Sequence, residues 1–587
     1  MAAGIYVADN TIPLFLPPKN AIYAFMISRF ALLIPLAGFC PAQDVARMDQ
    51  IVQSYVTNHQ FMGTVLVARA SQVLFSKGYG DANLELNVPN SPNTKFRLGS
   101  VTKQFTAASI LLLEERGKLS VSDPVKKYLP DAPATWDKIT IFHLLTHTSG
   151  IPNFTGFPDY AKLERYATTP AELVARFRDK PLEFEPGEKW NYSNSGYVLL
   201  SYLIEKITGD SYEKFVRENI FTPLGMKDSG YDSNSAVILH RASGYVSGKN
   251  GFENAGFVHM SVPQGAGALY STTEDLLKWE QGLFGGKVLH AASLEKMTTP
   301  FKNNYAFGLQ ADTAGGHKVI EHGGGIEGFN TELAYYPEDK LTVVVLGNVN
   351  GVAPEEIAKK LAALAHGETV KLPSERKEIT LDPKVLSRYV GAYQLNPGIN
   401  MLITLEGNQL VSKLGNQAPV PIFPESETLF FVKVVDAQLE FPKDDTQEKA
   451  SQLILHQNGR DITAKRLDDV EAKRVADSAA AAARRFKDQT AAPGSEAALR
   501  KLIEDVRLGK PDYDTMSSGL ANATRQQLPQ LQSTVAQLGA IQTVTFKGVG
   551  PAGPDIYLVK FENGSLEYRI WLAPDGKVES ANVRPPQ

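Results

Sequence analysis

The sequence predicts a multidomain protein with a large α/β unit, in which helices flank an antiparallel sheet, then an all-β module and a small α+β domain. Strand patterns lie at both ends of residues 43–365, around a helical middle. Period-two alternation fills residues 380–468, and residues 496–587 pass from helices to strands. Strands at both ends of a helical unit favour one antiparallel sheet that the two ends complete together. The chain of 587 residues is long enough for several domains.

Short apolar alternation locates the individual elements of residues 43–365. It predicts an opening helix and five strands, over 45–57, then 63–68, 72–80, 318–321, 329–336 and 341–348. The first two strands are close in sequence and the last three follow a long helical stretch. Pairing between the two groups would close the sheet.

The C-terminal part divides at polar and proline-bearing segments. Residues 366–379 (HGETVKLPSERKEI) form a predicted linker. The runs NMLITL and QLVSKL, joined by Glu-Gly-Asn, predict hairpins in the module 380–468. Residues 469–495 begin as an Ala-rich helix former and end at Pro493-Gly494, so they predict a helical linker.

Residues 1–42 have the features of a signal peptide region. A short basic segment from Met26, a possible alternative start, precedes the apolar run FALLIPLAGF, and cleavage is expected near Ala42. The one cysteine, Cys40, lies before that cleavage, so the mature chain would have no thiol chemistry. These features predict a periplasmic or secreted protein.

Composition excludes several classes of partner. The net charge of −4 and the absence of a Lys/Arg cluster give no footprint for nucleic acid. No apolar run after residue 43 is long enough for a stable membrane span. We expect a small-molecule or short-peptide substrate, no cofactor and no metal; composition leaves the oligomeric state open.

Two motif matches are rejected on context. Residues 323–328 fit the dinucleotide pattern G-x-G-x-x-G, but a strand-like segment follows where a helix is required. His143 and His147 have the spacing of helical metal ligands, yet the expected glutamate and third ligand are missing, which favours structural roles. No Gly-x-Ser-x-Gly elbow occurs.

Ser100 and Lys103 lie three residues apart, at the start of the apolar stretch FTAASILLL. Residues at this spacing share one helical face, and a buried lysine loses its proton more easily and can act as a base. The Ser-x-x-Lys spacing also occurs at Ser211, Ser293 and Ser374. The alternative is a serine that caps the helix beside a solvated lysine.

Two further motifs accompany Ser100. Tyr192-Ser193-Asn194 is the only Tyr-x-Asn in the chain and precedes an amphipathic helix, where Asn194 could also serve as a cap. His322-Gly323-Gly324-Gly325 follows a predicted strand, and glycines there allow a ligand to approach the backbone.

In chain order, these three motifs resemble the signatures of the β-lactamase and penicillin-binding-protein superfamily of serine hydrolases, in its class C-like branch. Flanking segments such as LLTHTSGIPNF, GAGALYSTTEDLLKW and HGGGIEGFNT are similar to family sequence, and the resemblance covers roughly residues 45–350. The module 380–468 resembles lipocalin-like domains attached to such peptidases.

The resemblance implies roles for the motif residues. Ser100 would form an acyl-enzyme, with its proton taken by Lys103 or Tyr192, and an ammonium on Lys103 would lower the pKa of the phenol. Asn194 would hold Lys103 and meet the substrate, while the N–H groups of Ser100 and Gly325 would form the oxyanion hole. Which of the two groups is the base remains open.

The sequence departs from many β-lactamases where His322-Gly323-Gly324 replaces Lys-Thr-Gly. The permanent positive charge is absent, so we expect poor turnover of penicillins. Peptidases of D-amino acid substrates and carboxylesterases in this superfamily commonly show the His-x-Gly form, so the resemblance implies D-amino acid peptides, amides or carboxylic esters as substrates. If His322 reads a substrate carboxylate, that preference should change with pH. The alternatives are a β-lactamase and a non-catalytic sensor of cell-wall peptides or β-lactams.

Overall fold

The computed structural model describes residues 41–248, 251–396, 399–415, 417–443, 448–457, 460–551, 553–573 and 575–584. Helix α1 (Pro41–Thr57) is its first element. Residues 1–40 of the predicted signal region, including Met26 and Cys40, lie outside the described residues. Among the residues described, no helix has the length and apolar character needed to cross a membrane.

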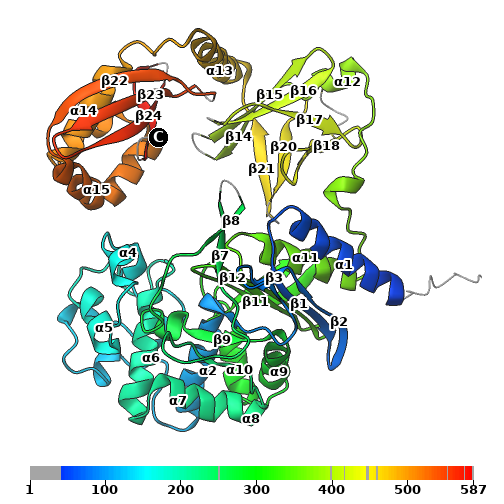
Figure 1. Ribbon diagram of the computed structural model, residues 1–587, viewed down its shortest axis with the longest axis vertical. Coiled ribbons are helices and arrows are strands. Elements are labelled where there is room, and N and C mark those ends of the chain that lie inside the picture. Colours follow the sequence, from blue (N-terminus) through cyan, green and yellow to red (C-terminus); the bar gives the residue numbers. More distant parts are fainter. Residues whose placement is uncertain are drawn as a thin grey trace, which may run out of the picture.

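A six-stranded antiparallel sheet, in the order β10-β11-β12-β13-β1-β2, forms the centre of the large unit (Figure 1). Its strands are β1 (Gly63–Arg69), β2 (Gln72–Tyr79), β10 (Gln310–Ala314), β11 (His317–Ile326), β12 (Phe329–Tyr336) and β13 (Leu341–Gly347). The two ends of the unit meet where β1 pairs with β13, with Val65 opposite Val345. The predicted antiparallel sheet is therefore confirmed, although edge strand β10 was not predicted because QADTA lacks strong apolar alternation.

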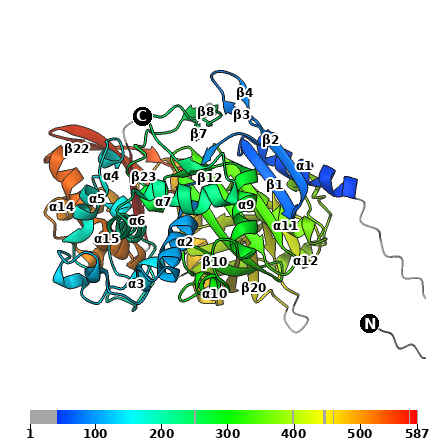
Figure 2. The ribbon, with the colours of Figure 1, turned by 90° about the horizontal axis from the view of Figure 1, so that it is seen from below.

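Helices cover both faces of this sheet. On one face, α1 and α11 (Ala353–Ala365) enclose a core that contains Ile51, Val343 and Leu361. The other face packs against the larger helical part, which lies on the opposite side of the unit from α1 (Figure 2). Its helices are α2 (Thr102–Glu115), α3 (Ile141–Leu145), α4 (Tyr160–Leu163), α5 (Pro170–Arg178), α6 (Asn194–Thr208), α7 (Tyr212–Val216), α8 (Thr222–Leu224), α9 (Thr273–Phe284) and α10 (Ala291–Thr298).

Short strands connect the helical part to the sheet. They are β3 (Asp81–Asn83), β4 (Val88–Pro89), β5 (Phe96–Arg97), β6 (Gly230–Tyr231), β7 (Tyr245–Gly248), β8 (Gly251–Asn254) and β9 (Leu269–Ser271). Strands β5, β9 and β6 form a small sheet of their own. Strand β5 ends three residues before Ser100, so this small sheet leads the chain to the candidate nucleophile.

The segment 366–379 carries packing of its own. Leu372 is buried in the core between the sheet and α1, and Arg47 of α1 pairs with Glu375 at 2.5 Å. Asp436 of the following module accepts hydrogen bonds from Lys360 at 2.8 Å and Arg376 at 2.6 Å. These contacts tie the segment to both of its neighbours.

The all-β module is a closed barrel of eight strands, β14 to β21. They are β14 (Gly391–Asn396), β15 (Ile399–Glu406), β16 (Gln409–Leu414), β17 (Val420–Pro424), β18 (Leu429–Val432), β19 (Ala437–Glu440), β20 (Gln452–Gln457) and β21 (Arg460–Arg466), preceded by α12 (Pro383–Ser387). Apolar side chains such as Tyr393, Ile422 and Phe430 fill its core. Closure removes the exposed strand edges that an open sheet would leave.

Helix α13 (Asp469–Asp488) links the barrel to the terminal α+β domain (Figure 1). That domain packs α14 (Ser495–Arg507) and α15 (Ser518–Leu538) against a four-stranded antiparallel sheet. Its strands are β22 (Ile541–Val549), β23 (Asp555–Phe561), β24 (Gly564–Leu572) and β25 (Val578–Arg584). Both C-terminal parts of the predicted fold class are thus confirmed.

Candidate active site

Ser100 lies in a single 3₁₀ turn, Gly99–Val101, directly before α2. Gly99 has the left-handed φ of 53°, and a Cβ atom there would lie only 2.7 Å from the backbone nitrogen of Gly325. Glycine is therefore required at position 99, because only glycine adopts this conformation readily and leaves room for β11. The backbones of the first and third motifs meet as a result.

Lys103 occupies the first turn of α2 and is completely buried. Its Nζ lies 2.9 Å from Ser100 Oγ, 2.9 Å from Asn194 Oδ1 and 2.8 Å from the carbonyl oxygen of Ala266. Burial lowers the pKa of Lys103 well below its usual range. No side chain caps α2, so Ser100 does not serve as the helix cap that the alternative required.

Tyr192 and Asn194 reach the same point from the start of α6. Lys103 Nζ lies 4.8 Å from the centre of the Tyr192 ring. The sequence suggested that a lysine ammonium would lower the pKa of this phenol, but burial raises that pKa, and a hydrogen bond with Ser100 offsets the rise only in part. Both groups are thus driven toward their neutral forms.

His322 is buried, and both of its ring nitrogens are engaged by the protein. Nε2 lies 2.9 Å from the Tyr305 hydroxyl and Nδ1 lies 2.6 Å from the carbonyl oxygen of Gly323. Burial, followed by the nearby Lys103, lowers the pKa of His322 to about 3. The sequence led us to expect that His322 titrates near neutral pH and reads a substrate charge. Burial and the contacts of both ring nitrogens instead favour a neutral ring across this range.

The glycines after His322 allow close backbone packing at the end of β11. A Cβ atom on Gly324 would lie 1.9 Å from the carbonyl oxygen of Leu98, and Thr331 donates a hydrogen bond to that oxygen at 2.9 Å. Gly325 is exposed beside Gly99. The rejected dinucleotide pattern is a hairpin here, because Gly328, with φ of 79°, turns β11 into β12.

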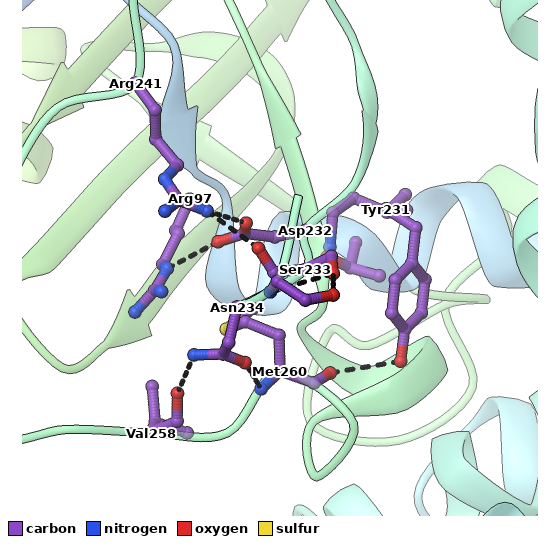
Figure 3. A network of polar contacts seen from close by, with 11 residues as sticks. Arg97, Tyr231, Asp232, Ser233, Asn234, Arg241, Val258 and Met260 are labelled. Atoms are coloured by element: carbon purple, nitrogen blue, oxygen red, sulfur yellow. Dashed lines mark hydrogen bonds and ion pairs between the residues drawn. The ribbon is translucent and has the colours of Figure 1, made fainter. Parts of the chain in front are cut away.

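A buried charge network that the sequence did not reveal holds Arg97, at the end of the strand β5 that leads to Ser100 (Figure 3). Asp232 is fully buried and accepts hydrogen bonds from Arg97 Nε at 2.6 Å and Arg241 Nη1 at 2.5 Å. Asn234 and Tyr231 extend the network to the backbone of Val258 and Met260. Because Arg97 lies 135 residues before Asp232 in the chain, no local spacing indicates that the two meet.

The second motif is also held by residues that lie outside all three motifs. Asn153 Oδ1 accepts the backbone N–H of Asn194 at 3.1 Å, and Asn194 Nδ2 donates to Thr155 Oγ1 at 3.3 Å. Both residues lie in or beside the segment LLTHTSGIPNF, whose similarity to family sequence was the one available signal. Ser100, Lys103, Tyr192 and Asn194 form a single cluster, and the third motif lies next to it.

Comparison with known proteins agrees with this geometry. Residues 48–368 match the family model described as Beta-lactamase, and residues 375–466 match a domain of unknown function, DUF3471. The chain is 33% identical to penicillin-binding protein 4* of Bacillus subtilis over 71% of this chain and 98% of that protein. It is 28% identical to the teichoic acid D-alanine hydrolase of Staphylococcus aureus over 51% of this chain and 73% of that protein.

A solved structure extends the likeness beyond the first domain. The octameric penicillin-binding protein homologue from Pyrococcus abyssi is similar with a TM-score of 0.52 and 28% identity, over 72% of this chain and all of that chain. The protein belongs to the β-lactamase and penicillin-binding-protein family and is a serine hydrolase.

Proposed function

We propose that the protein hydrolyses D-amino acid amides, short peptides or carboxylic esters through an acyl-enzyme on Ser100, with neutral Lys103 as the base. The observation that carries this proposal is the set of three partners around Lys103 Nζ. A neutral amine has two N–H donors and one lone pair. Asn194 Oδ1 and the Ala266 carbonyl can only accept, so they take the two N–H groups and leave the lone pair for the Ser100 hydroxyl.

Acylation then follows from these contacts. Lys103 accepts the hydroxyl proton as Ser100 Oγ attacks the substrate carbonyl carbon, and the carbonyl oxygen becomes an oxyanion. The N–H groups of Ser100 and Gly325 stabilise that charge. Lys103 returns the proton to the leaving alcohol or amine, and water later hydrolyses the ester with Tyr192 beside the reacting atoms. Asn194 keeps Lys103 oriented throughout.

The third motif supports the substrate class. His322 is neutral and its ring nitrogens contact Tyr305 and Gly323, so it offers no fixed cation for the carboxylate of a β-lactam. The name of the staphylococcal relative, a D-alanine hydrolase, also favours D-alanyl substrates. A non-catalytic sensor would need no base, yet the nucleophile and base are intact here.

A substrate panel tests this proposal. Purified protein would be assayed with p-nitrophenyl esters, D- and L-amino acid p-nitroanilides and the β-lactam nitrocefin. We expect turnover of short esters and of D-amino acid anilides, with nitrocefin the poorest substrate. Nitrocefin as the best substrate would favour a β-lactamase, and acylation without turnover of any compound would favour a sensor.

The N-terminal segment supports action outside the cytoplasm. A basic residue followed by a short apolar run and small residues near Ala42 is the pattern of a signal peptide. Expression of the full chain in a Gram-negative host, followed by N-terminal sequencing of the periplasmic fraction, should give a start close to Gln43. An uncleaved chain confined to the cytosol would contradict export.

A further inference from the structure

His147 lies directly behind the second motif, although the acylation chemistry does not use it. It follows α3 in the segment LLTHTSG and is 2% exposed. Its φ of 56° lies in the left-handed region. A residue with a side chain is strained in this conformation and keeps it only where the surrounding contacts hold it.

Two hydrogen bonds connect His147 to both sides of Tyr192. The His147 carbonyl oxygen accepts the backbone N–H of Asn191 at 3.0 Å, and its ring Nδ1 accepts the backbone N–H of Ser193 at 3.2 Å. Because Nδ1 accepts, the ring proton of the neutral tautomer is on Nε2. The backbone around Tyr192 is thus docked onto one residue.

Aromatic side chains enclose the imidazole ring of His147. Its centroid lies 4.3 Å from that of Tyr192, 4.6 Å from Tyr305 and 5.1 Å from Tyr197. Nε2 is buried and has no hydrogen-bond partner among the described residues. Burial, with Lys103 and His322 nearby, holds the pKa of His147 well below its usual range, so the ring stays neutral beside the base.

We infer that His147 is a positioning residue that sets the Tyr192-Ser193-Asn194 turn against Ser100 and Lys103. The inference rests on the proposed function. Asn194 Oδ1 accepts from Lys103 Nζ at 2.9 Å, so a shift of the turn moves one of the two acceptors that orient the base. Substrate binding does not require His147, whereas the rate of acylation does.

Substitutions can separate this role from general packing. Asparagine places Oδ1 near the position of Nδ1 and tolerates a left-handed φ, so His147→Asn keeps the acceptor and the backbone. Phenylalanine keeps a ring but loses the acceptor, and His147→Gly loses the acceptor without backbone strain. His143 offers a matched control, because its Nδ1 accepts the backbone N–H of Thr140 at the same 3.2 Å but only caps α3.

The measurements are kcat and KM for a short p-nitrophenyl ester, thermal melting, and hydrogen exchange of the amides in residues 190–194. We expect His147→Phe and His147→Gly to lower kcat at least about tenfold, with KM within about twofold of the unaltered protein. Exchange of these amides should accelerate in both variants. His147→Asn should restore kcat to within about threefold and restore protection, and His143→Asn and His143→Phe should leave kcat unchanged.

Three results would overturn the inference. The first is an equal kcat in His147→Phe and the unaltered protein. The second is a folded His147→Asn whose kcat stays as low as that of His147→Phe. The third is an increase in KM with kcat unchanged. An unaltered protein that neither hydrolyses nor forms an acyl adduct would instead contradict the proposed function. In that case the exchange data still decide whether His147 fixes the turn, since unchanged exchange in His147→Gly would reject it.

Discussion

Ser100–Lys103 and Ser211–Lys214 have the same spacing in one domain but opposite surroundings. Ser211 caps α7, its Oγ accepting the backbone N–H of Lys214 at 3.2 Å, and Lys214 Nζ pairs with Asp210 at 2.7 Å on the surface. The hydrogen bond with Asp210 raises the pKa of Lys214. Ser100 caps nothing, and burial lowers the pKa of Lys103.

The difference shows that spacing supplies proximity and packing supplies reactivity. Both lysines lie close to their serine in sequence, but Lys103 is removed from water and its Nζ contacts Ser100, Asn194 and the Ala266 carbonyl instead of a carboxylate. Its partners, Asn194 and Ala266, come from distant parts of the chain. Ser211–Lys214 is the helix cap with a solvated lysine that was the alternative interpretation of Ser100.

Removal of the two serine hydroxyls should have the largest and most unequal effects. Ser100→Ala should lower kcat for a p-nitrophenyl ester by at least about a thousandfold, because the acyl-enzyme cannot form. Ser211→Ala should leave kcat unchanged and lower the free energy of unfolding by about 1 kcal/mol through the lost cap. Ester hydrolysis and urea denaturation measure both effects. Normal turnover by Ser100→Ala would remove the distinction between the motifs.

Replacement of each lysine by methionine should have the second-largest effect on kcat and should distinguish Lys103 from Lys214. Lys103→Met should lower kcat about 10²- to 10⁴-fold because the base is lost, whereas Lys214→Met should not change it. In the unaltered protein, activity should fall as pH decreases through the lowered pKa of Lys103, because protonation removes the base.

The same variants should differ in stability. The folded pKa of Lys103 lies below its ordinary value of 10.5, so the native state binds fewer protons than the unfolded state between those two values. Lys103 therefore makes the free energy of unfolding rise with pH up to about 10.5, and Lys103→Met should stabilise the protein at neutral pH and reduce this slope. Urea denaturation across the pH range measures it. An unchanged slope would show that Lys103 is charged in the fold.

Removal of the C-terminal domains should have a smaller effect on activity. It tests whether the first domain is sufficient for ester hydrolysis. A chain of residues 44–379 should keep kcat for a short ester within about twofold, because all three motifs precede residue 326. A chain of residues 44–370 should melt at a lower temperature, since it loses the buried Leu372, worth about 1.5–3 kcal/mol, and the Arg47–Glu375 pair. If the longer chain is folded but inactive on esters and on D-amino acid peptides, the C-terminal domains help to build the site.

The smallest expected effect concerns His322. Because its pKa is about 3, the ratio of KM for an anionic substrate to KM for a neutral ester should stay constant between about pH 5.5 and about pH 8. Steady-state kinetics with matched esters, with and without a carboxylate, would measure the ratio. A change in the ratio that disappears in His322→Gln would mean that the ring is accessible and titrates.

The sequence predicted those features that local pattern controls. Strand β12 has the predicted range, and the three motifs are confirmed as neighbours in space. It could not predict the contact of Arg97 with Asp232 or of Lys103 with the Ala266 carbonyl, because each joins positions more than 100 residues apart in the chain. It also could not show that burial lowers the pKa of His322, since a motif gives residue types without the partners and burial that determine a pKa.

The location of the covalent adduct tests the central claim most directly. The protein would be treated with a fluorophosphonate probe, digested and analysed by mass spectrometry, alongside Ser100→Ala and Ser211→Ala. The adduct should lie on Ser100 in the unaltered protein and in Ser211→Ala, and labelling should be absent from Ser100→Ala. Labelling that persists undiminished in Ser100→Ala, or an adduct on any other serine, would contradict the assignment of Ser100 as the nucleophile.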